Sequence, residues 1–145
     1  MGSWNKALQY IQKEVDEIQL INGTTPIERG LLAEEKAVFA LNSLKDRGNQ
    51  FPGKRRIVDV RRTERGSEED YQGKDIVIVF QTGETIYVQV KNWWTKNAEK
   101  KYIKRGICFI AVFSENNGKG LEKIIYNTIS RFLRKNNFNK RKPYI

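Results

Sequence analysis

Apolar residues recur along the chain with the three- and four-residue spacing of helices in some segments and as short, dense runs in others. Helices are expected over four segments: 3–21, 26–47, 96–105 and 121–135. Strands are expected over four more: 55–63, 75–80, 86–91 and 107–113. The resulting order, α-α-β-β-β-α-β-α, predicts an α/β fold in which helices flank a mixed sheet.

The order of these segments also predicts how the sheet is assembled. The first three strands follow one another along the chain and should form a meander, and the helix over 96–105 then crosses over to the last strand. That strand, 107–113, is a continuous apolar run, which is typical of a buried central strand. The polar segment 64–74 is expected to be turn-like.

A length of 145 residues suits a single domain. Within it we expect an N-terminal amphipathic helix in 1–23, a core in 26–113, and a C-terminal helix with a basic tail in 120–145. The apolar stripe of the N-terminal helix either packs on its own domain or forms a contact between two copies of the chain. The stripe consists of Trp4, Leu8, Ile11, Val15 and Ile18.

A carboxylate interrupts the apolar face of the helix over 26–47. Because successive residues are about 100° apart around a helix, Glu34 is expected in the middle of that face and Glu35 at its border. A carboxylate among apolar side chains is costly unless it pairs with a lysine or arginine or binds a metal ion, and both explanations remain open. The apolar residues of the face are Ile27, Leu31, Val38, Leu41 and Leu44.

The net charge and the low numbers of histidine and cysteine limit the kinds of partner and of site that the protein can have. The chain has 27 Lys and Arg against 17 Asp and Glu, and its formal charge of +10 favours a nucleic-acid partner. It has no histidine and one cysteine, Cys108, so an internal disulfide, a Cys/His zinc site and a histidine base are all excluded. Cys108 lies in an apolar run and is expected in the core of a protein from a reducing compartment.

The sequence contains neither a stretch that would cross a membrane nor a segment that resembles a signal peptide. We therefore expect no membrane partner. The expected location is the cytoplasm, in association with the nucleoid when the protein is bound to DNA.

The residues with the most specific chemistry lie in the two strands of the expected hairpin. Three oxygen ligands come from it: the carboxylate of Asp75, the side-chain carbonyl of Gln89 and the backbone carbonyl of Val90. With the carboxylate of Glu34 they form a set that can bind Mg²⁺ or Mn²⁺ beside a phosphodiester. Lys91 would contact the scissile phosphate or orient the attacking water.

The register of the hairpin decides whether these side chains can meet. Asp75 and Lys91 share a sheet face only if paired residues have numbers with an even sum. A loop of three or five residues allows this register, whereas a two-residue loop at Gly83-Glu84 does not. A β-bulge would also restore it, and the sequence leaves the register open.

At these residues the chain resembles the PD-(D/E)XK nuclease superfamily, over roughly residues 26–113. The first motif is similar to the first-helix glutamate of archaeal Holliday junction resolvases, the second to the strand-start aspartate of the superfamily, and the third to its (D/E)XK motif. The motifs are Gly30-x-x-x-Glu34, Gly73-Lys74-Asp75-Ile76 and Gln89-Val90-Lys91.

The resemblance implies a restriction-endonuclease-like fold with a βββαβ core and a metal-dependent endonuclease activity. The implied catalytic residues are Glu34, Asp75, Gln89 and Lys91. The chain departs from the pattern in two places. No proline precedes Asp75, and a glutamine replaces the acidic residue of the last motif, as in the Mrr-like branch of restriction enzymes.

Two further acids and two tryptophans lie near these motifs. Asp59 and Asp70 could each add a metal ligand, although an ion pair with a neighbouring arginine also accounts for Asp59. Trp93 and Trp94 follow Lys91 directly, and either ring could pack on the sheet or stand near bound DNA.

Basic side chains outside the motifs are the candidates for phosphate contacts. The predicted DNA-binding residues are Arg55, Arg56, Arg61, Arg62, Lys96, Lys100, Lys101, Lys104 and Arg105. The leading hypothesis is a metal-dependent DNA endonuclease, either junction-resolving or Mrr-like, that acts as a homodimer. The alternatives are a non-catalytic DNA-binding module, motivated by Gln89, and a protein that acts on or binds RNA.

Overall fold

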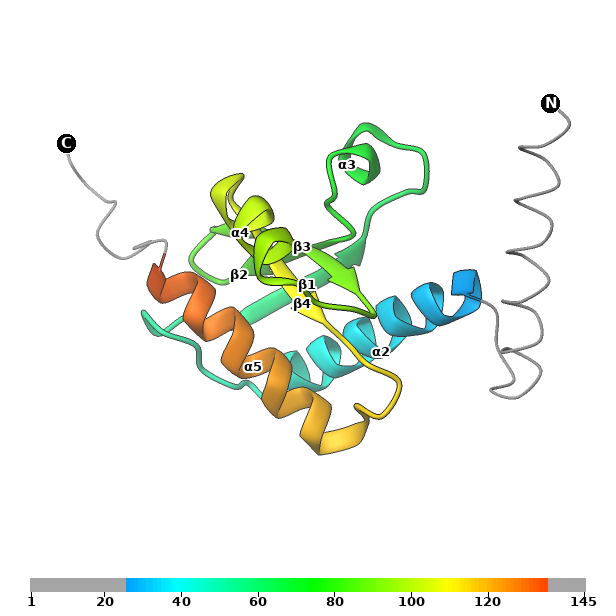
Figure 1. Ribbon diagram of the computed structural model, residues 1–145. Coiled ribbons are helices and arrows are strands. Elements are labelled where there is room, and N and C mark those ends of the chain that lie inside the picture. Colours follow the sequence, from blue (N-terminus) through cyan, green and yellow to red (C-terminus); the bar gives the residue numbers. More distant parts are fainter. Residues whose placement is uncertain (1–25, 136–145) are drawn as a thin grey trace, which may run out of the picture. The chain divides into compact units, whose positions relative to one another are not determined.

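The computed structural model of the chain describes residues 26–135 (Figure 1). The expected helix over 3–21, with its possible dimer contact, and the basic tail after residue 135 lie outside the described residues. The chain divides into a short unit that ends at Leu32 and a larger unit that begins at Ala33. Every contact discussed below lies within the larger unit.

The described part contains four strands in one sheet and four helices, in an order that matches the sequence pattern. The strands are β1 (Ile57–Arg62), β2 (Ile76–Phe80), β3 (Thr85–Lys91) and β4 (Ile107–Ala111). The helices are α2 (Pro26–Asp46), α3 (Glu68–Tyr71), α4 (Lys96–Lys104) and α5 (Gly118–Lys135).

The sheet has the strand order β1-β2-β3-β4. The first three strands are antiparallel to their neighbours, and β4 lies parallel to β3 after the crossover through α4. The predicted α/β architecture, a mixed open sheet with flanking helices, is therefore confirmed.

The two faces of the sheet are covered by different helices (Figure 1). Alternate strand residues such as Ile76, Val88 and Ile110 form one buried cluster with residues of α5 and of α2 from Ala33 onward. On the opposite face α4 contributes Tyr102, whose ring centroid lies 5.7 Å from that of Phe109.

The continuous apolar run of β4 has a different explanation from the predicted one. The expectation of a central strand is wrong, because β4 lies at one side of the sheet, next to β3 alone. Its residues are nevertheless buried, since α5 and α4 cover its two faces: Cys108 and Ile110 belong to the core cluster, and Phe109 packs on Tyr102. A helix on each face requires apolar residues at successive positions.

The face of α2 that packs on the core differs from the one predicted from its large apolar residues. The buried face consists of Ala33, Ala37, Ala40, Leu41 and Leu44. Glu34 is therefore partly exposed at the border of the buried face rather than in its middle, and Glu35 is exposed. Small alanines allow a helix to approach a sheet closely, which explains the shift of the face.

A short helix, α3, lies in the polar connection between β1 and β2, where only turns were expected. Ser67 caps it, because its hydroxyl oxygen accepts a hydrogen bond from the backbone N–H of Asp70 at 3.2 Å. Acidic residues fill the first turn, where they interact favourably with the helix dipole. A serine followed by acidic residues is typical of the start of a helix, and this pattern is present in the sequence.

Arg55 is a structural residue and not a surface cation. It is 3% exposed, and its Nε and Nη2 donate to the two carboxylate oxygens of Glu84 at 2.7 and 2.8 Å. Its Nη1 donates to the backbone carbonyl of Pro52 at 2.8 Å. The prediction that Arg55 contacts DNA is wrong, because burial leaves its guanidinium no surface to offer a phosphate.

The Arg55–Glu84 pair gives a test of the fold. Glu84→Ala leaves a buried guanidinium without its carboxylate, so we expect the free energy of unfolding to fall by about 2–3 kcal/mol. Urea unfolding followed by circular dichroism measures this loss. As a control, Glu35→Ala removes an exposed carboxylate from α2 and should change stability by less than about 0.5 kcal/mol. Equal effects of the two substitutions would contradict the structural role of the pair.

Candidate active site

The site lies where β1, β3 and β4 end and β2 begins, which is here called the site end of the sheet. The antiparallel pairing of β1 with β2 and of β2 with β3, and the parallel pairing of β3 with β4, bring these four strand termini together. Glu34 of α2 also reaches this end, since its carboxylate lies 3.2 Å from Nη2 of Arg62, the last residue of β1.

The hairpin has the register that the chemistry needs. Ile76 pairs with Val88 and Ile78 with Ile86, so the numbers of paired residues have an even sum. At the turn, the N–H of Phe80 donates to the carbonyl of Glu84 at 2.9 Å.

The regular pairing ends at Ile76 and Val88, and the N–H of Asp75 donates to the carbonyl of Val88, so the ladder is irregular at Asp75. Lys91 lies on the same face as Gln89, two residues further along β3. The even register holds from Ile76 to Val79 of β2, and the side chain of Asp75 reaches β3 through its hydrogen bond with the Val90 N–H.

Asp75 is tied to β3 by its backbone and by its side chain. Its N–H donates to the carbonyl of Val88 at 2.8 Å, and its Oδ2 accepts from the N–H of Val90 at 2.9 Å. The carboxylate is thus held in one orientation beside the Gln89-Val90-Lys91 motif. Two predicted ligand-bearing segments that are far apart in the sequence meet here.

The environment of Asp75 disfavours its charged form. Burial is the largest cause that raises the pKa of its carboxyl from 3.8 to about 6. The hydrogen bond from Val90 lowers this pKa, neighbouring Glu34 raises it, the Lys91 ammonium lowers it, and Asp70 raises it. Glu34, Asp70 and Lys91 therefore all lie close enough to Asp75 to affect its charge.

Gln89 offers an oxygen with no other partner. The side chain is 4% exposed, and its Oε1 is buried without a hydrogen bond in the described part of the chain. Its Nε2 lies 3.5 Å from the carbonyl oxygen of Val90, so the two predicted neutral ligands are adjacent. A buried acceptor without a hydrogen bond and a neighbouring carbonyl are oxygen ligands of the kind that a hard divalent cation takes.

Glu34 has the arginine partner that was one of its two explanations. The Arg62–Glu34 pair is partly exposed on both sides, and it places a guanidinium within the carboxylate cluster. Of the two rival acids, Asp70 lies near Asp75, whereas Asp59 is exposed in the middle of β1. Asp70 uses its Oδ2 to accept from the N–H of Gly66 at 2.9 Å.

The close approach of Tyr102 and Gln89 to Gly73 escaped the sequence analysis. Gly73 has φ +83°, and a Cβ there would lie 2.7 Å from Cε1 of Tyr102 and 3.0 Å from Oε1 of Gln89. Gly73 and Tyr102 thus enclose the Gln89 amide from two sides. A Gly two residues before an Asp was a visible signal, but the approach of Tyr102 was not.

The remaining predicted DNA-binding side chains are exposed, as phosphate contacts require. They are Arg56, Arg61, Arg62, Lys96, Lys100, Lys101, Lys104 and Arg105. Arg105 also has a local role, because its Nη2 donates to the carbonyl of Gln72 at 3.0 Å and its guanidinium lies over the ring of Tyr102. This contact joins the end of α4 to the segment that leads into Asp75.

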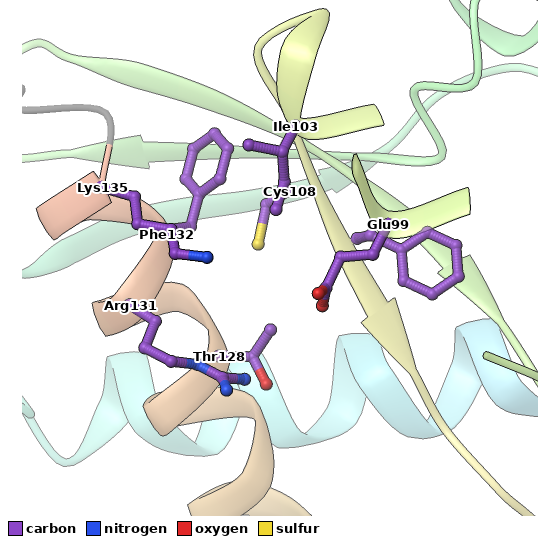
Figure 2. A pocket seen from close by; sticks show the side chains of 8 residues that line it. Glu99, Ile103, Cys108, Thr128, Arg131, Phe132 and Lys135 are labelled. Atoms are coloured by element: carbon purple, nitrogen blue, oxygen red, sulfur yellow. The ribbon is translucent and has the colours of Figure 1, made fainter. Parts of the chain in front are cut away.

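Two cavities lie elsewhere. One, of about 390 Å³, lies beside Arg47, Lys123 and Tyr126, near the start of α5. The other, of about 30 Å³, has the Cys108 sulfur facing its interior and residues of α4 and α5 around it (Figure 2). Burial raises the pKa of the Cys108 thiol, which keeps it protonated and agrees with its predicted place in the core.

Neither of these cavities is lined by Glu34, Asp75 or Lys91. Within residues 26–135, no group of three or more His, Cys, Asp or Glu side chains is arranged to hold a metal ion. The candidate ligand set differs from such a group, since it combines two carboxylates with a side-chain amide and a backbone carbonyl.

Comparison of the chain with protein-family models, with curated proteins and with solved structures gave no match. In the described residues, none of the helices has the length and apolar character needed to cross a membrane.

Gly73 provides a test of the enclosed Gln89 amide. Gly73→Ala introduces both a strained φ and a clash with Tyr102 or Gln89, so it should lower the free energy of unfolding by about 2–4 kcal/mol. Gly66→Ala is the matched control, because Gly66 has φ +78° but nothing within 4 Å of an added Cβ. It should cost only about 1–2 kcal/mol. Equal losses in urea unfolding would contradict the close approach at Gly73.

The pKa of Asp75 gives a test in the absence of metal. A raised pKa means that Asp75 contributes its full stability below the unfolded value and loses it as the pH rises through about 6. Asp75→Asn is neutral and keeps an acceptor for the Val90 N–H. With EDTA present, the variant should therefore be more stable than the wild type by about 2 kcal/mol near pH 8. This gain should shrink towards about pH 4. A gain that is the same at both pH values would contradict the effect.

Proposed function

We propose that this protein is a divalent-metal-dependent DNA endonuclease of the PD-(D/E)XK type with a restriction-endonuclease-like fold. The observation that supports this most is the hydrogen bond from the Val90 N–H to Oδ2 of Asp75, which holds the carboxylate against the Gln89-Val90-Lys91 motif. The carboxylate of Glu34 and the orphaned oxygen of Gln89 extend the same group of ligands. A net charge of +10 suits a polyanionic substrate.

Asp75, Glu34, Gln89 and the carbonyl of Val90 would hold Mg²⁺ or Mn²⁺. When bound, the ion supplies a water of lowered pKa and neutralises charge that develops on the phosphate. The crowding of Glu34 and Asp70 around a half-buried Asp75 is electrostatically costly in its absence, and this cost favours cation binding. Arg62 provides a positive charge to Glu34 in the metal-free protein.

The chain's own residues perform the other steps. Asp75 is fixed in orientation by the Val90 N–H, so it can hold a ligand without losing rotamer freedom at the moment of binding. Lys91 lies on the same face of β3 as Gln89, where its ammonium would contact the scissile phosphate and stabilise the additional negative charge of the transition state. The exposed cations of β1 and α4 would position the DNA backbone.

A homodimer that places one such site on each strand would allow cleavage of a duplex or of a branched junction. Junction-resolving and Mrr-like activities are both compatible with this arrangement. The second candidate function is a non-catalytic DNA-binding module, favoured by the neutral Gln89 and by the arginine that already pairs with Glu34. The two candidates differ in one observable, which is cleavage in the presence of metal.

The test is incubation of the purified chain with labelled linear duplex, single-stranded, branched and supercoiled DNA, and with RNA, in Mg²⁺, Mn²⁺ or EDTA. We expect metal-dependent cutting of DNA that falls by about 10²–10³-fold in Lys91→Ala and at least as far in Asp75→Ala, with DNA binding largely retained. Asp59→Ala is the matched control, because it removes an exposed carboxylate from β1 and should leave cleavage unchanged. Cutting that survives in both site variants would refute the site. Tight DNA binding without cutting in any metal would support the binding module, and a preference for RNA would overturn the choice of substrate.

A further inference from the structure

Exposed aromatic side chains gather at the site end of the sheet. In the part of the chain from Ala33 to Lys135, five aromatic residues are strongly exposed, and four of them lie in segments that leave this end. The four are Tyr71, Trp93, Trp94 and Phe113, and the fifth is Phe39 on α2. They lie in the three connections after β1, β3 and β4, which all leave the site end of the sheet.

The two tryptophans are closest to the proposed chemistry. Trp93 and Trp94 follow Lys91 and precede α4, and they remain 45% and 49% exposed. Trp93 is held by the core, since its ring centroid lies 6.0 Å from that of Phe109. The Lys91 ammonium lies 5.9 Å from the same ring. The Trp93 indole is thus fixed beside Lys91 with much of its surface open, and the exposed Trp94 follows it directly.

The surroundings of these rings are cationic. Lys91 precedes them, and the exposed side chains of Lys96 and Lys100 follow in α4. A flat apolar surface bordered by lysines is complementary to a ligand that has aromatic faces and a negatively charged backbone. An apolar peptide or a second copy of this basic chain lacks that combination. A nucleic acid has both.

Base faces are accessible only when bases are unpaired, because in a continuous duplex each base stacks on its neighbours and shows only its edges in the grooves. We propose that Trp93 and Trp94 form a base-stacking subsite, and that the preferred substrate is DNA with an unpaired nucleotide beside the scissile phosphate. Branch points, gaps and single strands meet this requirement, and a blunt continuous duplex does not. The inference rests on the proposed function for its scissile phosphate, but stacking itself needs no cleavage.

The experiment measures binding without metal, so that it does not depend on catalysis. In a Trp4→Phe background the only tryptophans are Trp93 and Trp94, and stacking on a base quenches their fluorescence. The probes are a short single strand, a blunt duplex and the same duplex with a central gap, all in EDTA. We expect quenching by the single strand and the gapped duplex and little quenching by the blunt duplex. Trp94→Ala should weaken binding of the first two by about tenfold and of the blunt duplex by less than about twofold.

Phe39→Ala is the matched control, since it removes an exposed aromatic ring that lies outside the site-end connections. It should leave the affinity for all three probes unchanged. Trp94 is preferred over Trp93 for the main variant, because Trp93 packs on Phe109 and its loss could disturb the fold. Circular dichroism and thermal unfolding establish that each variant is folded.

The outcomes separate the two proposals. Selective loss of binding to unpaired DNA in Trp94→Ala supports the stacking subsite, even if no metal produces cleavage. Absence of quenching, or an equal loss for all three probes, overturns the subsite, even if the chain proves to be an active nuclease. Stronger quenching by a single-stranded RNA of the same sequence would overturn the assignment of DNA as the ligand.

Discussion

The hydrogen bond from the Val90 N–H to the Asp75 carboxylate joins the start of β2 to the end of β3, and the rest of the site depends on it. It depends on the register in which Ile76 pairs with Val88, since a slip of one residue would turn Gln89 and Lys91 into the core. The apolar alternation of the hairpin enforces this register, because Ile76, Val88 and Val90 must face the core. The packing of the core thus selects the geometry of the polar face.

The same contact has an electrostatic consequence. A carboxylate held against β3 is partly removed from water, and Glu34 and Asp70 add negative charge nearby. One N–H donor and the Lys91 ammonium offset only part of this cost, as the raised pKa of Asp75 shows. The charged Asp75 that a metal ion would need therefore lowers the stability of the metal-free protein. Many functional sites have such a cost until a ligand binds.

The sequence predicted the site better than it predicted the surroundings of the site. Chain order is a local property, so the meander could be anticipated, whereas the sequence left the register of the hairpin open. The burial of Arg55 could not be anticipated, because its partner Glu84 lies 29 residues away and is brought near only when the hairpin folds back. The position of Glu34 was misplaced for a different reason. Large apolar residues dominate a helical wheel, whereas the small Ala33 and Ala37 determine which face of α2 approaches the core.

The contacts between residues of distant segments on the polar face could not be predicted from the sequence, for a related reason. Tyr102 approaches Gly73 across the sheet surface, and no periodicity in α4 indicates which of its side chains points there. The serine cap of α3 was visible, but a helix of four residues has too few turns to produce an apolar stripe. Propensity and periodicity therefore predict the helices and strands. The residues that surround the site side chains are determined by packing in three dimensions.

The glutamine of the last motif is consistent with the burial that the structure gives it. Gln89 is far more buried than Asp75, and a carboxylate at that position would lose much more hydration than the one at Asp75. A neutral amide supplies an oxygen at the same place without another negative charge next to Asp75 and Glu34. Without a metal ion, Arg62 and Lys91 already lie near three carboxylates, those of Asp75, Glu34 and Asp70, so a glutamate at position 89 would add a further negative charge. The amide therefore keeps the metal-free site stable while leaving an acceptor available for a cation.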